Sequence, residues 1–246
     1  LVTAVASIGM YFVIINQFLA DIIGRKIMLF LTIFGMGLAS LFIMLSTNII
    51  QYMISLFFLY VFFSSDIWTI YISEESAKEH RGFNLNIILV FGCIGAILVP
   101  IFSSIFITQV SVNWRAMTWF ALLAMPISFL ILGVKETSKF NELKEKKKSG
   151  DYIKQSPFIN FKKPFQPKFR KAFIPLLIMA FITGMNYVFI QMGMNLIKAS
   201  DYITLADANI VVMVMSFAAI LGYLITGIFA DKIGRKPLFY IFTIII

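Results

Sequence analysis

The sequence predicts an all-α polytopic membrane protein. Hydrophobic residues make up 60% of the 246 residues and charged residues 13%, about half the charged share of a soluble domain. The charges are clustered, so long uncharged runs separate them. An apolar helix of about 20 residues spans a bilayer, and its backbone amides must be paired within the segment. A large soluble helical core would need polar faces on most helices, and these runs lack them.

Eight segments carry this apolar pattern. Seven are long enough to span a bilayer, and the chain end cuts the eighth short. Away from the ends of these segments, Asp66 is the only acidic or basic residue. We therefore expect helices over about residues 1–20, 27–46, 50–73, 84–108, 115–134, 173–196, 206–230 and from 237 onward.

The ends of the sequence indicate that it is part of a longer protein. It begins at Leu1 inside one apolar run and ends inside another. The segment Leu1–Phe18 lacks the basic start of a signal peptide. We expect a complete protein with further helices at both ends. The single cysteine, Cys93, excludes an internal disulfide in this chain.

Basic residues gather in the loops on one side of the membrane. Alternate loops must share a side, and those after the first, third, fifth and seventh segments hold 19 of the 21 Lys and Arg residues. Positive charge is concentrated in cytoplasmic loops. We therefore expect an integral protein of the plasma membrane whose cytoplasmic loops are 21–26, 74–82, 135–171 and 231–236. The net charge of +9 then reflects membrane orientation and does not indicate binding to nucleic acid.

A short pattern, Ala-Asp-x-Ile-Gly-Arg-Lys, occurs twice, first at Ala20 and again at Ala230. The copies are six expected helices apart, so the repeated unit is six helices. A long basic loop with three prolines separates the halves as a solvated linker. We expect a twelve-helix protein of two halves, as in many transporters. Its parts here are an N-terminal half without its first helix (1–134), the linker (135–171) and the start of a C-terminal half (172–246).

The two copies resemble the duplicated cytoplasmic signature of the major facilitator superfamily. That resemblance implies two halves that rock about a central site, with Asp and Arg contacts that close the cytoplasmic side. Gly suits a short turn, a carboxylate stabilises a helix N-terminus, and Arg pairs with carboxylates. The alternative, simple anchoring by positive charge, requires neither Asp nor Gly. The first copy departs from the pattern, because Gln17 stands where the second has Gly227. The signature residues are Asp21, Gly24, Arg25, Lys26, Gly227, Asp231, Gly234, Arg235 and Lys236.

Further segments resemble the sugar-porter-like and metabolite–proton symporter-like branches of that superfamily. They are Tyr71–Glu74 followed by Arg81-Gly82, and Glu136–Lys139. The paired glutamines of sugar porters are absent before Asn186, which weakens sugar as the substrate. The resemblance implies a cytoplasmic charge network of Arg25 with Glu74, Arg81 and Glu136. The alternative is a set of independent solvated charges, each contributing little to stability.

Two polar features inside the membrane are candidate substrate or proton sites. A carboxylate within a span is costly, so Asp66 is a candidate to carry a coupled proton or to bind a cationic substrate, although it can also be a structural acid. Thr69 and Ser73 share its helix face and can orient it. The second feature is a polar stripe on one helix face, which can bind solute or join helices. It comprises Tyr187, Gln191 and Asn195. Asn186, in a segment that resembles the Gly-Ile-Asn of sugar porters, is a further candidate.

The sequence therefore favours a secondary active transporter that moves a small solute by alternating access, coupled to protons, within the lipid bilayer. The alternative is a non-transporting membrane sensor or scaffold with the same fold. An intramembrane enzyme is a weaker alternative. The sequence has no Walker-type loop, catalytic triad or set of metal ligands, so we expect neither enzymatic activity nor a cofactor.

Overall fold

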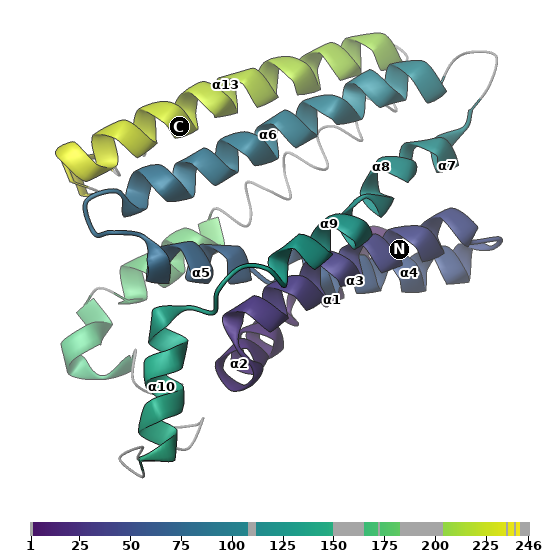
Figure 1. The fold of residues 1–246 in the computed structure, drawn as a ribbon. Coiled ribbons are helices and arrows are strands. Elements are labelled where there is room, and N and C mark those ends of the chain that lie inside the picture. Colours follow the sequence, from purple (N-terminus) through teal and green to yellow (C-terminus); the bar gives the residue numbers. More distant parts are fainter. Residues whose placement is uncertain are drawn as a thin grey trace. The chain divides into compact units, whose positions relative to one another are not determined.

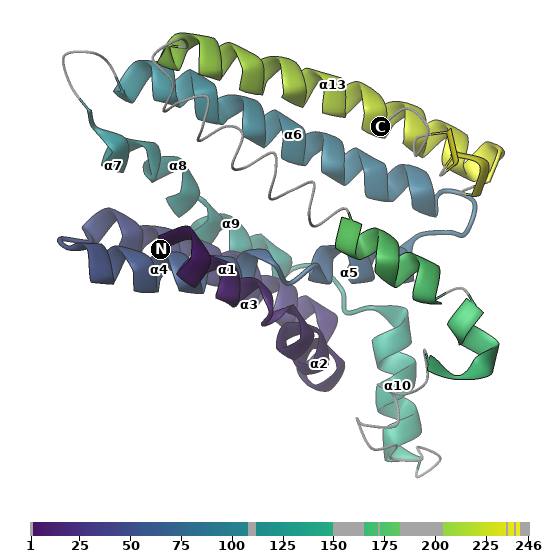
Figure 2. The same ribbon diagram turned by 180° about the vertical axis from the view of Figure 1, so that it is seen from behind.

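The computed structural model describes residues 2–107, 112–149, 165–171, 173–182, 204–234, 236–238 and 240–241 (Figures 1 and 2). The chain divides into two compact units, one formed by residues 1–144 and 212–246 and the other by residues 145–211. The named elements of the described part are all helices, and its one β-contact is an isolated bridge between Ile107 and Val112. The prediction of an all-α fold is confirmed.

Five segments of the described chain are long and apolar enough to cross a membrane. They are α3 (Arg25–Leu45), α4 (Ile49–Phe63) with α5 (Ile67–Glu75), α6 (Arg81–Phe106), the consecutive α7 (Trp114–Met117), α8 (Trp119–Leu122) and α9 (Ala124–Ile131), and most of α13 (Leu205–Lys232). They match the second, third, fourth, fifth and seventh expected spans. Of the sixth span only Phe173–Ile182 is a described helix, and of the eighth only residues 237–238 and 240–241 are described.

Small residues let the helices of the first unit approach closely. Helix α3 packs against α4 and against α9. A Cβ atom added at Gly35 would lie 2.7 Å from the ring of Phe62 on α4, and one at Gly37 would lie 2.5 Å from Cγ of Met125 on α9. Helix α1 (Val2–Met10) packs on the other helices mainly through α4. Side chains of the neighbouring helices therefore fill the space that glycine leaves open.

Three of the expected spans are interrupted where the sequence predicts continuous helices, and one of them, the fifth expected span, is formed by the consecutive α7, α8 and α9. The first expected helix is divided into α1 and α2 (Val13–Ile23) by a turn at Tyr11 and Phe12. The third is divided at residues 64–66 into α4 and α5. Asp66 has φ 49°, the left-handed conformation that Asp and Asn adopt more readily than other non-glycine residues. Hydropathy reports the solvent that a segment prefers and carries no signal for a local change of backbone direction.

The expected linker contains a helix, α10 (Ser138–Lys148), which is mostly charged and exposed. In the second unit, the described residues include an edge-to-face contact between Phe165 and Phe173, with ring centroids 5.1 Å apart. The start of α13 is capped there by Thr204, whose hydroxyl oxygen accepts from the Asp207 amide at 3.2 Å. Asp207 Oδ2 in turn accepts from the amide and hydroxyl of Thr204 at 3.0 and 2.6 Å. A hydroxyl and a carboxylate thus satisfy the free groups at this helix end.

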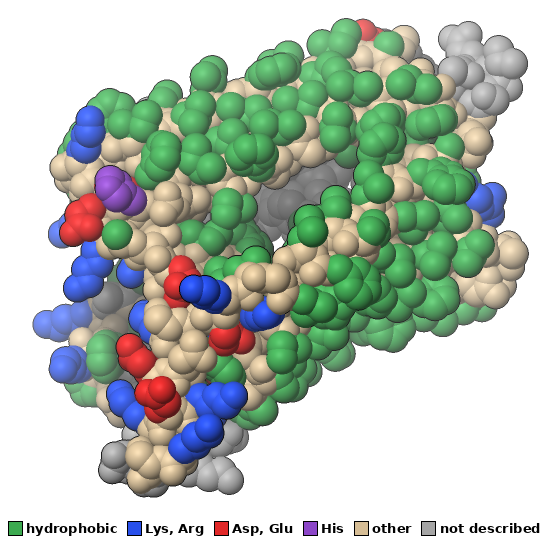
Figure 3. Space-filling view, viewed as in Figure 1, with side chains coloured by type: hydrophobic (Ala, Val, Ile, Leu, Met, Phe, Trp, Pro, Cys, Tyr) green, Lys and Arg blue, Asp and Glu red, His purple; other side chains and the backbone are tan. Residues whose placement is uncertain are grey.

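Side-chain type varies along the surface in the way that a membrane protein requires. Hydrophobic side chains cover the visible sides of α6 and α13, and Lys and Arg side chains gather around α10 (Figure 3). Large apolar residues such as Phe91, Leu130 and Phe217 are more than half exposed. Lipid rather than water is the solvent that makes this exposure favourable.

Candidate functional site at the two motif turns

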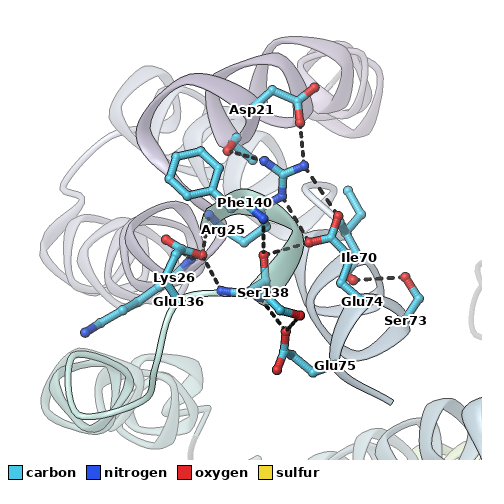
Figure 4. A network of polar contacts seen from close by, with 12 residues as sticks. Asp21, Arg25, Lys26, Ile70, Ser73, Glu74, Glu75, Glu136, Ser138 and Phe140 are labelled. Carbon is cyan, nitrogen blue, oxygen red and sulfur yellow. Dashed lines mark hydrogen bonds and ion pairs between the residues drawn. The ribbon is translucent and has the colours of Figure 1, made fainter. Parts of the chain in front are cut away.

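The first motif forms the turn between α2 and α3. Gly24 joins the two helices with φ 111° and ψ 152°, a conformation that is almost restricted to glycine. The turn places Arg25 at the start of α3 with its side chain directed back to α2 (Figure 4). Arg25 Nη2 lies 2.8 Å from Asp21 Oδ1, and Nη1 donates to the carbonyl of Ala20 at 3.2 Å. Arg25 thereby satisfies the carbonyl end of α2.

A buried ion pair connects this turn to α5. Arg25 Nε lies 3.3 Å from Glu74 Oε2, and Nη2 donates to Glu74 Oε1 at 3.4 Å. Both side chains are about one-tenth exposed, whereas Asp21 is 64% exposed. Thr137, which is fully buried, donates its hydroxyl to Glu74 Oε2 at 2.7 Å. The phenyl ring of Phe140 lies 5.3 Å from the guanidinium carbon and shields it.

Glu136 caps the N-terminus of α3. Its Oε1 atom accepts hydrogen bonds from the backbone amides of Arg25 and Lys26, both at 3.1 Å (Figure 4). These amides have no partner within the helix, and the helix dipole favours a negative charge there. A Cβ atom at Gly24 would overlap the Glu136 carboxylate. Glycine at this position therefore permits both the turn and the cap.

Two side-chain contacts attach the segment before α10 to α5. Glu75 Oε1 accepts from the amide of Ser138 at 2.7 Å and from its hydroxyl at 2.8 Å. The hydroxyl of Tyr71 donates to the carbonyl of Lys135. With Glu136 and Thr137, these contacts hold the segment between α9 and α10 against α3 and α5. The contacts of Glu75, Thr137, Ser138 and Phe140 were not expected from the sequence, because no spacing rule relates residues that are more than 60 positions apart.

Arg81 lies outside this cluster. The sequence places it in one network with Arg25, Glu74 and Glu136, and the structure brings only those three together. Arg81 begins α6, and its Nε atom is buried without a hydrogen-bond partner in the described part of the chain. The loop after α5 carries the chain away from the first motif turn, and the residue motif alone does not encode that path.

The second motif contacts a different helix start. At the end of α13, the two carboxylate oxygens of Asp231 accept hydrogen bonds from the amides of Gly82 at 3.2 Å and Phe83 at 2.9 Å. A Cβ atom at Gly82 would lie 2.5 Å from Asp231 Oδ1, and one at Gly227 would lie 3.0 Å from Cβ of Asn86. Glycine on both helices thus allows α13 to reach the N-terminus of α6.

The remaining motif residues form the turn after α13. Gly234 has φ 91°, so it repeats the positive φ of Gly24. Lys236 follows in a described helical segment, and Arg235 lies outside the described residues. The two motif turns therefore share their glycine conformation.

The intramembrane candidates are only partly described. Asp66 lies at the break between α4 and α5, and its side chain does not cap α5. The hydroxyls of Thr69 and Ser73 donate to the backbone carbonyls of Asp66 and Ile70 at 2.6 and 2.9 Å, so they do not bind the Asp66 carboxylate. The polar stripe of Tyr187, Gln191 and Asn195 lies outside the described residues, as does Asn186.

Comparison with known proteins identifies the family. The family model described as Major Facilitator Superfamily matches residues 1–246. No curated protein and no solved structure matches the chain. The family consists of membrane transporters rather than enzymes. Membership in it does not favour the alternative of a non-transporting membrane sensor or scaffold. The chain is an integral membrane protein with part of the superfamily's fold, and the family implies a small-molecule substrate. It belongs to the major facilitator superfamily.

Proposed function

We propose that the protein is a secondary active transporter that moves its solute by alternating access, with the second motif turn as a reversible latch. The contact of Asp231 with the start of α6 supports this proposal. By the six-helix repeat, α6 belongs to the first half of the transporter and α13 to the second, so this contact joins the halves. A carboxylate at a helix N-terminus contributes about 0.3–1 kcal/mol, an interaction weak enough to break in each transport cycle.

The first motif turn has the complementary role of a rigid support. Arg25, Glu74 and Glu136 belong to one half, and their contacts bury the charges or use helix amides. Breaking a buried ion pair leaves an uncompensated charge. We therefore infer that this cluster stays intact while the Asp231 contact opens and closes.

The test of the latch uses a single cysteine at position 86, which faces Gly227 in the closed contact. Asn86→Cys is placed in the intact transporter with Cys93 and any other cysteine replaced. Asp231→Asn should increase the rate of alkylation by a water-soluble maleimide several-fold, because the closed state loses its charge–dipole contact. Asp207→Asn, the same change at the other end of α13, is the matched control and should leave the rate unchanged. Equal rates in all three proteins would reduce the motif to an orientation signal.

We also propose that Asp66 carries the coupled proton. Its support is a carboxylate at a helix break within the span Ile49–Glu75, where irregular backbone is tolerated only beside protein or water. A hydrophobic carbodiimide, which reacts with protonated carboxyl groups in membranes, should modify Asp66 at low pH and progressively less as the pH rises. Asp66→Asn, which retains the preference for positive φ, is the control and should remove the modification. Labelling of Asp66 that does not vary with pH would exclude a proton-carrying role.

The orientation of the protein is a further part of the proposal. The basic loops are assigned to the cytoplasm. The segments Tyr71–Glu74, Arg81-Gly82 and Glu136–Lys139 support the sugar-porter-like or metabolite–proton symporter-like branch, and the plasma membrane is the proposed location. Thr47, after α3, and Lys146, near the end of α10, are exposed positions for single cysteines. A membrane-impermeant reagent applied to intact cells should label position 47 and not position 146. The reverse pattern would refute the orientation.

A further inference from the structure

The break between α4 and α5 has a hydrogen-bond arrangement that an ordinary kink does not require. In a regular helix the amide of Ser65 would donate to the carbonyl of Val61, four residues earlier. Instead it donates to Phe62 at 3.3 Å, while the preceding amide, that of Ser64, still follows the helical pattern to Tyr60 at 3.1 Å. The Val61 carbonyl therefore loses its helical donor at the point where the span changes direction.

Asn16 supplies the missing donor. Its Nδ2 atom lies 2.7 Å from the Val61 carbonyl oxygen, and the Asn16 residue is only 5% exposed. The contact comes from α2, 45 residues away in the sequence. A carbonyl left unpaired in hydrocarbon costs several kcal/mol. The side-chain amide of Asn16 removes this cost in the broken form of the span.

Glycine in α1 brings the two helices close enough for this contact. A Cβ atom at Gly9 would lie 2.6 Å from the Phe57 carbonyl oxygen and 3.0 Å from the Val61 amide nitrogen. Any larger residue at position 9 would push α1 away from α4. The approach at Gly9 and the hydrogen bond of Asn16 thus act on the same last turn of α4, immediately before the break.

The broken segment leaves further polar groups free. The hydroxyl oxygen of Ser64 is buried without a partner in the described part of the chain. Nor do the described residues provide a backbone acceptor for the amides of Asp66 and Trp68, and no side chain caps α5. A continuous helix would pair these two amides with the carbonyls of Phe62 and Ser64. Closing the break would therefore change both the pairing of these amides and the direction of the Asp66 side chain.

We propose that Asn16 is a positioning residue that holds the α4–α5 break open and so sets the place of Asp66. The importance of that place rests on the proposed proton-carrying role of Asp66. Asn16 precedes Asp21 by five residues in α2, about 7.5 Å along the helix. A displacement of α2 near the first motif turn would thus reach the break through one hydrogen bond. Sequence patterns do not reveal this role, because a lone Asn in an apolar run has no characteristic spacing.

Hydrogen exchange of the intact transporter in lipid nanodiscs, read by mass spectrometry, tests the proposal without a known substrate. Asn16→Val removes the donor at nearly constant volume. The Val61 carbonyl should then recover the amide of Ser65, and exchange of amides 65–68 should slow by roughly tenfold, the factor expected for one net backbone hydrogen bond. Asn16→Gln, which keeps an amide donor, should restore much of the wild-type rate.

Slower or faster hydrogen exchange in Asn16→Val distinguishes a positioning role of Asn16 from simple stabilisation of helix packing. Thr32→Val is the matched control, because Thr32 is equally buried and its hydroxyl bonds only within α3, to Leu29 at 2.9 Å. It should leave exchange at 65–68 unchanged. Faster exchange throughout α4 in Asn16→Val would show that Asn16 only stabilises helix packing, and unchanged exchange would show that the break does not depend on it. Either result would overturn the proposal.

Carbodiimide labelling in the same variants distinguishes this inference from the proposed function. If Asn16 positions Asp66, Asn16→Val should change the labelling rate at position 66 by several-fold, and Thr32→Val should not. Slower exchange with unchanged labelling would overturn the link between Asn16 and Asp66. Loss of pH-dependent labelling in the wild type, with exchange still dependent on Asn16, would instead refute the role of Asp66 and leave the break assignment intact.

Discussion

The two copies of one sequence motif make different contacts. In the first copy, Asp21 is exposed and pairs with Arg25 four residues later, and the adjoining helix start is capped by Glu136 from a distant segment. In the second copy, Asp231 itself caps a helix start, that of α6. Both copies thus place a carboxylate on free helix amides, but the carboxylate and the helix come from different parts of the chain.

This difference shows that the motif determines the glycine turn and the position of the acid, whereas the fold determines which residues they contact. Each copy supplies a Gly turn with positive φ and an acid at the end of the preceding helix. The first copy lies beside α5 and the segment before α10, which provide Glu74 and Glu136. The second lies beside the glycine-containing start of α6. On the proposed function, the buried ion pair supports the first turn, and the exposed charge–dipole contact of the second turn opens and closes.

Among the substitutions that test this comparison, Arg25→Ala should reduce the stability of the protein most. It would leave Glu74 buried without its cation, a change that typically costs about 3–5 kcal/mol. The thermal unfolding temperature of the purified protein should fall sharply, and Glu74→Gln in the same protein should recover part of the loss. Asp21→Ala is the control, because an exposed ion pair contributes only about 0–1 kcal/mol. Equal losses for the two single variants would contradict the assignment of stability to the buried pair.

Glycine substitution at the two turns gives an intermediate effect. Gly24→Ala imposes unfavourable φ, which costs on the order of 1–3 kcal/mol, and also displaces the Glu136 carboxylate. Gly234→Ala imposes a similar φ, but the nearest atom to its Cβ, Pro237 Cδ, lies at 4.0 Å. Thermal unfolding should therefore be affected more by Gly24→Ala. A larger loss of thermal stability for Gly234→Ala would mean that the Glu136 cap contributes little to stability.

The smallest expected effect is that of Glu136→Gln, which removes the charge but keeps an oxygen that can accept from the α3 amides. The loss should be about 0.3–1 kcal/mol, the size of a charge–dipole interaction at a helix end. High salt should reduce the difference between variant and wild type, because salt screens this interaction. The unfolding temperatures of variant and wild type, compared at low and at high salt, measure this screening. A difference that does not change with salt would indicate steric rather than electrostatic stabilisation.

Much of the architecture was predictable because membrane spans depend on a property of single segments. Uncharged runs located the five described spans, and the repeated motif located both turns. The breaks at Tyr11–Phe12 and at Asp66 were not predictable, since hydropathy does not report backbone φ. The resemblance grouped Arg25 with Glu74, Glu136 and Arg81, and the structure places the first three in contact and Arg81 at the start of α6. Contacts between distant segments depend on the path of the chain, which the motif residues do not encode.

The most direct test of the latch is the accessibility of position 86, which faces Gly227 in the closed contact. The experiment measures the rate at which a water-soluble maleimide alkylates Asn86→Cys in the otherwise cysteine-free, intact transporter, with Gly227 unchanged. If Asp231 holds α13 on the start of α6, adding Asp231→Asn should increase the alkylation rate several-fold, and adding Asp207→Asn should not. Alkylation at the same rate with and without the Asp231 carboxylate would contradict the central claim that this residue closes the contact between the two halves.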